Sequence, residues 1–83
     1  MIWPAQVRAA RALLGLSQAQ LAEQAGVGLA TVQRVEGSED EIRGTARSIL
    51  KLQTTLEDLG IVFIPKDDEH EYGVKLRKVT REN

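Results

Sequence analysis

The chain has 83 residues, of which 42% are hydrophobic, and its net charge is −1. This length allows one small domain with a modest core, and the absence of cysteine excludes a disulfide framework and a thiolate metal site. No apolar run reaches the length of a membrane span, and the start MIWPAQVRAA lacks the basic flank and long apolar core of a signal peptide, so we expect a cytoplasmic protein.

The first predicted helix begins at Pro4, because the missing N–H of proline costs nothing in the first turn of a helix. Val7, Ala10 and Leu14 follow at helical spacing and indicate its buried side. Gly15 is expected to end it. Arginines 8 and 11 fall on the other side of this helix, where we expect them to be solvated.

A second helix is predicted to begin after Ser17, whose hydroxyl can cap the free N–H groups of the first turn. Gln20 stands three residues further on and completes a capping box of the S-x-x-Q type. Gly26 is expected to end this helix in the left-handed conformation that suits a C-cap. Its buried side is formed by Leu21, Ala22 and Ala25.

A third, short helix is predicted from Leu29 to about Glu36, with Gly28 as its N-cap. Val32 and Val35 point inward at helical spacing, and Gly37 ends the helix. A helical turn is also predicted where Ser38 and Glu41 form a second capping box.

A longer helix is predicted from about Thr45 to Leu59, with Gly60 as its C-cap. Its apolar stripe recurs at steps of three and four residues, as expected for one buried face, and consists of Ile49, Leu52, Leu56 and Leu59.

The hydrophobic period then changes. The segment 61–65 (IVFIP) is β-branched and aromatic, and the segment 72–79 (YGVKLRKV) alternates, which together predict a two-stranded hairpin around the polar loop 66–71. An isolated hairpin is marginal in water, so we expect it to pack on the long helix or to pair with another chain.

The interruption GVG inside LSQAQLAEQAGVGLATVQRVEG joins two short helices by a tight turn, which indicates a helix-turn-helix. Val27 is apolar although it lies in the turn, so we expect it to fill the core between the helices. Ala22 is small and permits their close approach. Such a turn holds the third helix at a fixed angle, so that its outer face and N-terminus can enter a DNA major groove.

Four outward residues of the third helix are therefore candidates for reading bases: Leu29, Ala30, Gln33 and Arg34. Arginine can bind guanine and glutamine can bind adenine through two hydrogen bonds, whereas the two apolar residues can contact a thymine methyl group. At the start of the second helix, Ser17 and Gln18 offer N–H groups and an amide to a phosphate.

The segment SQAQLAEQAGVGLATVQRVEG closely resembles the helix-turn-helix of the Cro and phage-repressor family, also called the XRE family. The residues that carry the resemblance are Ser17, Gln18, Ala22, Gly26, Val27, Val32, Val35 and Glu36. With the flanking helices it covers roughly residues 4–60. It implies a mainly α fold, a lambda-repressor-like bundle of four to five helices, here with a C-terminal two-stranded β-hairpin.

The resemblance also implies a sequence-specific DNA-binding transcriptional regulator, typically a repressor that binds a double-stranded operator as a homodimer. It assigns base reading to the four outward residues above. Phosphate contacts fall on Ser17, Gln18, Thr31, Arg43, Thr45 and Arg47. The chain departs from the family pattern at Gly28, at the apolar pair 29–30 and at the acidic segment 39–41, whose like charge lowers affinity for phosphate.

We expect residues 1–60 to form the DNA-binding domain and residues 61–83 a hairpin and tail for dimerisation or partner binding. One alternative is an antitoxin-type module that binds a toxin-like protein partner and autoregulates its operon; another is a scaffold that has lost DNA binding. No catalytic grouping, phosphate loop or metal-ligand spacing is present, so we expect neither an enzyme nor a bound cofactor or metal. His70 is expected in a solvated turn.

Overall fold

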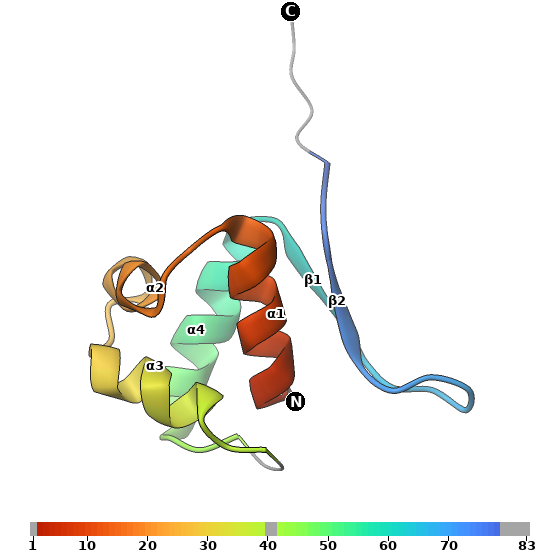
Figure 1. Cartoon of the computed structure of the whole chain (residues 1–83), viewed down its shortest axis with the longest axis horizontal. Helices are drawn as coiled ribbons and strands as arrows, with labels where there is room; N and C mark the ends of the chain where they lie inside the picture. Colours follow the sequence, from red (N-terminus) through yellow and green to blue (C-terminus); the bar gives the residue numbers. More distant parts are fainter. Residues whose placement is uncertain (1, 40–41, 79–83) are drawn as a thin grey trace, which may run out of the picture.

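The computed structural model describes residues 2–39 and 42–78. Within them the chain forms four helices followed by a β-hairpin (Figure 1). In chain order the elements are α1 (Pro4–Leu14), α2 (Gln18–Ala25), α3 (Leu29–Glu36), α4 (Ala46–Asp58), β1 (Ile61–Ile64) and β2 (Gly73–Leu76). This architecture confirms the expected fold class, a mainly helical lambda-repressor-like bundle with a C-terminal hairpin.

The capping box at the start of α2 is confirmed. The Ser17 hydroxyl accepts the N–H of Gln20 at 3.1 Å, and the Gln20 side chain accepts the N–H of Ser17 at 2.8 Å. Thr45 caps α4 in the same way, accepting the N–H of Ser48 at 3.1 Å. Each side chain satisfies an N–H that the first helical turn leaves without a partner.

The turn between α2 and α3 also forms as predicted. Gly26 has a φ of +69°, a left-handed conformation that glycine adopts without steric cost. The next residue, Val27, donates its N–H back to the carbonyl of Ala22 at 3.0 Å. Its side chain is half-buried against the core. The turn therefore reverses the chain and adds an apolar contact that holds α3 across α2.

The core lies between the four helices and the hairpin. All four helices and β1 contribute fully buried or nearly buried side chains to it, including Val7, Ala10, Leu21, Val32, Val35, Leu52, Leu56 and Ile61. These positions recur at helical spacing along α1–α4, so burial of one face of each helix stabilises the bundle.

The end of α4 differs from the prediction. Leu59 leaves 37% of its surface exposed, so it does not belong to the buried stripe, and it occupies the C-cap position that was predicted for Gly60. Gly60 follows with a φ of +106° and directs the chain into β1. The capping box predicted for Ser38 and Glu41 depends on residue 41, which lies outside the described residues.

The hairpin is antiparallel, with Ile61 paired to Leu76 and Ile64 paired to Gly73. Its strands are shorter than the predicted segments, and residue 79 lies outside the described residues. The buried side chain of Gln6 on α1 donates to the carbonyls of Ile64 at 3.2 Å and Gly73 at 2.8 Å. One glutamine thus fastens both strands to the helical bundle.

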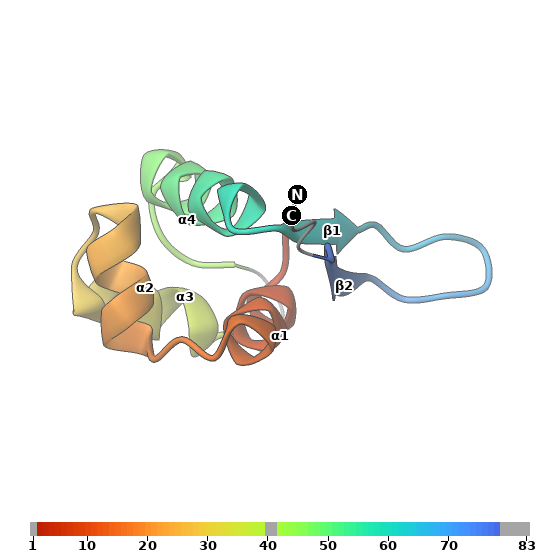
Figure 2. The same ribbon diagram turned by 90° about the horizontal axis from the view of Figure 1, so that it is seen from above.

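A second attachment lies close by. The rings of Trp3 and Tyr72 stack, with their centroids 5.1 Å apart and an angle of 8° between their planes. Seen from above, the hairpin lies beside α1 and α4 and projects away from α2 and α3 (Figure 2). None of the helices in the described part of the chain has the length and apolar character that crossing a membrane requires.

Candidate nucleic-acid interface

The outer face of α3 carries all four residues predicted to read bases. Leu29, Ala30, Gln33 and Arg34 are exposed, and they stand three and four residues apart, which places them on one side of a helix. Leu29 leaves 43% of its surface exposed although it is apolar. No side chain caps the N-terminus of α3, where Gly28 is the N-cap residue. Gly28 therefore adds no side chain at this end of the helix.

The inner face of α3 fixes which side points outward. Val32 and Val35 are fully buried, and Glu36 is only 4% exposed. Residues 32 and 36 are four apart, so the same helical spacing that buries the valine also buries the carboxylate. A buried carboxylate requires a cation or several hydrogen-bond donors.

Arg11 on α1 supplies that cation. Its Nε and Nη2 atoms donate to the two carboxylate oxygens of Glu36 at 2.9 and 3.0 Å. Its Nη1 donates to the carbonyl of Leu16 at 2.9 Å, in the connection between α1 and α2. The hydrogen bonds to Glu36 raise the pKa of the Arg11 guanidinium above its usual value. The pair therefore ties α1, the α1–α2 connection and the end of α3 together.

Two further donors reach Glu36. The Gln18 amide nitrogen donates to its carboxylate at 3.1 Å, and the Arg8 guanidinium donates to its main-chain carbonyl. The expectation that Arg11 is solvated is therefore wrong, whereas Arg8 is exposed as expected but also contacts the end of α3. One feature of the sequence indicates these contacts. Glu36 lies one turn after Val32, on the inner side of its helix, and a carboxylate buried there needs cationic partners.

The candidate phosphate contacts divide into two groups. Ser17 and Thr45 use their hydroxyl groups as helix caps, and Thr45 also donates to the Ser48 hydroxyl at 3.0 Å. Thr31 is half-buried near the N-terminus of α3, whereas Arg43 and Arg47 are exposed before and within α4. Among the candidate DNA-contact residues, the exposed positive charge comes from Arg34, Arg43 and Arg47, while the only acid of α3 is buried and paired.

Of the acidic segment 39–41, only Glu39 is described, and it is exposed. A second acidic region occupies the hairpin loop, where Asp67 accepts the main-chain N–H groups of Glu69 and His70 at 2.8 and 2.7 Å. The His70 ring lies 3.0 Å from the same carboxylate. Hydrogen bonds between residues of the loop itself therefore hold its conformation.

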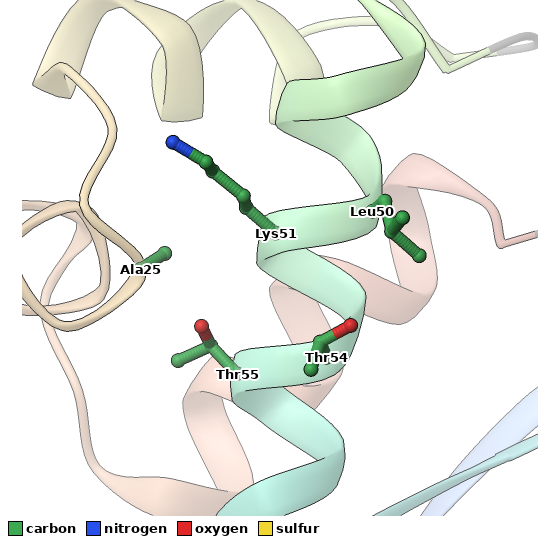
Figure 3. Close-up of a pocket in the computed structure, with 5 residues that line it drawn as sticks. All are labelled: Ala25, Leu50, Lys51, Thr54 and Thr55. Atoms are coloured by element: carbon green, nitrogen blue, oxygen red, sulfur yellow. The ribbon is translucent and has the colours of Figure 1, made fainter.

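A shallow hollow of about 280 Å³ lies between α2 and α4 (Figure 3). Ala25 on α2 faces Lys51 and Thr55 on α4, whereas Leu50 points away from them. Leu50 leaves 62% of its surface exposed. With small and hydroxyl side chains around a single lysine, the hollow offers no grouping of catalytic or metal-binding side chains.

Comparison with known proteins identifies the segment that contains this interface. Residues 7–45 match the protein-family model described as Helix-turn-helix. The match runs from the middle of α1 to the N-cap of α4, so it contains α2, the Gly26 turn and α3. No curated protein matches the chain.

Proposed function

We propose that this protein is a repressor which occupies an operator as a dimer. The premise is that residues 7–45 carry an XRE-type helix-turn-helix and that the protein is a DNA-binding transcriptional regulator. The observation that carries this proposal is the outer face of α3, where Gln33 and Arg34 are exposed and only the inner face packs on the core. A cytoplasmic location is part of the proposal, because the operator is chromosomal or plasmid DNA.

In this proposal the outer face of α3 enters the major groove. Arg34 binds the O6 and N7 atoms of a guanine, and Gln33 binds the N6 and N7 atoms of an adenine. Leu29 and Ala30 lie at the start of the helix and contact thymine methyl groups or leave room for the backbone. Two polar and two apolar side chains favour a short half-site in which few bases are read.

The phosphate contacts flank this helix. Arg43, in the connection from α3 to α4, and Arg47, at the start of α4, are exposed and positively charged. Ser17, Thr31 and Thr45 lie near helix N-termini. Gln18 uses one hydrogen of its amide nitrogen for Glu36, which leaves the second hydrogen for a phosphate oxygen. The Glu36 carboxylate thereby orients the amide before DNA arrives.

A dimer is proposed because one such half-site gives weak binding, whereas two linked half-sites multiply the affinity. The long helix α4 and the hairpin form the dimer surface, with strands of the two copies joined in one sheet. The recognition helices of the two copies then contact half-sites about one DNA turn apart, or about 34–36 Å.

The test is selection of binding sites from a random duplex pool with the purified full chain at moderate salt. An enriched palindrome with half-sites about one helical turn apart supports the proposal. The matched control is the double variant Gln33→Ala/Arg34→Ala, which changes exposed side chains only and is expected to fold but to enrich no sequence. Failure of the folded wild-type chain to enrich any sequence would contradict sequence-specific binding, and a single enriched half-site would contradict the dimer.

A further inference from the structure

The outer edge of β2 is an unpaired strand edge. Arg77 donates its N–H to the carbonyl of Gly60 at 2.9 Å, which fixes the residues that face β1. The main-chain groups of successive residues in an antiparallel strand point alternately toward and away from a given neighbouring strand. Val74 and Leu76 therefore direct their N–H and C=O groups away from β1. Within the described chain the sheet has only these two strands, so no strand receives those groups. Such an edge is a template for one further strand.

The surface next to this edge has room for a strand. A hollow of about 190 Å³ lies between α1 and β2, lined by Ala5, Gln6, Ala9, Tyr72, Gly73 and Val74. The two alanines stand one helical turn apart on α1 and have the smallest apolar side chains, so the hollow stays open.

The side chains of β2 are also less covered than those of β1. Leu76 leaves 39% of its surface exposed, and Tyr72 and Val74 are half-buried, whereas the paired residue Ile61 is only 2% exposed. The edge that has unpaired main-chain groups is thus also the edge with incompletely covered apolar side chains.

We propose that β2 pairs in antiparallel fashion with β2 of a second copy of this chain, across a twofold axis at Val74, to form a four-stranded sheet. The proposal rests on the proposed dimer and names the surface that makes it. In this register Val74 lies opposite Val74 of the second copy, and Tyr72 lies opposite its Leu76. All three positions direct their main-chain groups across the new interface, and their apolar side chains cover the hollow over α1.

Charge selects this register. It places Lys75 opposite Gly73 of the second copy and Glu71 opposite its Arg77, so unlike charges meet twice across the twofold axis. Glu71 and Arg77 are exposed, and neither has an ion-pair partner in the part of the chain that the structure describes. A register shifted to a twofold axis at Lys75 would set two lysines directly opposite each other, which is destabilising.

The position of the hairpin suits this use. β2 lies beside α1, and the hairpin projects away from α2 and α3 (Figure 2). Pairing at this edge therefore leaves the outer face of α3 uncovered in both copies.

The test is sedimentation equilibrium of the full chain without DNA. Arg77→Glu and Glu71→Arg each replace two attractive pairs by two repulsive ones, and each is expected to raise the dimer dissociation constant roughly tenfold. The double variant Glu71→Arg/Arg77→Glu is expected to return it close to the wild-type value. Residues 71 and 77 are about 20 Å apart along one strand, so only a pair between copies explains this rescue. Glu23→Arg reverses an exposed charge on α2, outside the proposed dimer surface, and is the matched control that leaves the constant unchanged.

Amide exchange locates the paired edge independently. The N–H groups of Val74 and Leu76 are expected to exchange slowly in the dimer and faster on dilution, whereas that of Phe63, which points outward from β1, stays fast. Slow exchange at Phe63 instead, or absence of rescue in the double variant, would overturn pairing through β2. If neither single variant changes the dimer dissociation constant, only the pairing through β2 is overturned. If the wild-type chain stays monomeric both without DNA and bound to DNA, the proposed dimer is overturned as well.

Discussion

Arg11 and Glu36 lie 25 residues apart in the chain and are joined by two hydrogen bonds of 2.9 and 3.0 Å. The carboxylate side chain is only 3% exposed and the guanidinium side chain 24%. Because the pair connects α1 to the last residue of α3, it helps to set the orientation of the helix that presents the candidate base-reading side chains.

Arg11→Ala is expected to destabilise the fold by about 2–3 kcal/mol, because it leaves a buried carboxylate without its cation. Urea unfolding followed by circular dichroism measures this loss. Arg47→Ala is the control, since Arg47 is exposed on α4 and its truncation should change stability by less than about 0.5 kcal/mol. Equal stability of the two variants would show that the pair contributes nothing to the fold.

Gly26→Ala is expected to cost about 1–2 kcal/mol, because a side chain at a φ of +69° is strained even though no neighbouring atom blocks it. Gly28→Ser should have the opposite sign and stabilise by a few tenths of a kcal/mol, since Gly28 has extended backbone angles and serine is a better N-cap. Thermal unfolding compares the two variants. A melting temperature for Gly26→Ala at or above that of wild type would contradict the turn described here.

Gln6→Ala is expected to loosen the hairpin more than the helices, since the Gln6 amide holds the carbonyls of Ile64 and Gly73. Hydrogen exchange of the β1 and β2 amides should accelerate by roughly tenfold, equivalent to about 1.4 kcal/mol, a typical loss for buried hydrogen bonds. Gln24→Ala on the exposed side of α2 is the control. Uniform acceleration through α2 and α3 would show instead that Gln6 supports the whole fold.

Asp67 is expected to titrate below the usual aspartate pKa of about 3.9, because the N–H groups of Glu69 and His70 donate to its ionised carboxylate. A lowered folded pKa means that the contribution to stability is present above the unfolded pKa and is lost as the pH falls through the folded value. Carboxyl titration by NMR, in the folded chain and in urea, measures both values. An equal pKa in the two states would contradict the loop geometry.

Local signals were sufficient to predict most of the helices. The Ser17 capping box, the turn at Gly26 and the bounds of α3 each depend on residues within about four positions of one another, so spacing alone predicts them. The ends of α4 and of the strands were less accurate, because an end such as Leu59 depends on how the next element packs.

Contacts between distant segments were not predictable in the same way. The pairing of Arg11 with Glu36 and the hold of Gln6 on the hairpin join residues 25 and up to 67 positions apart, and no local pattern specifies such partners. The outward residues of α3 were placed correctly because the buried valines on the same helix fix its orientation. Their contacts with DNA stay a prediction.

The central claim is that α3 reads bases, and Arg34→Ala tests it most directly. The affinity of this variant and of wild type is measured for the selected duplex and for each single-base substitution of one half-site, at fixed salt. The account predicts a loss of about 1–3 kcal/mol on the selected duplex and relaxed discrimination at one base pair only, with Gln18→Ala weakening all duplexes alike. An equal loss for Arg34→Ala on every duplex would make Arg34 a phosphate contact and contradict the claim.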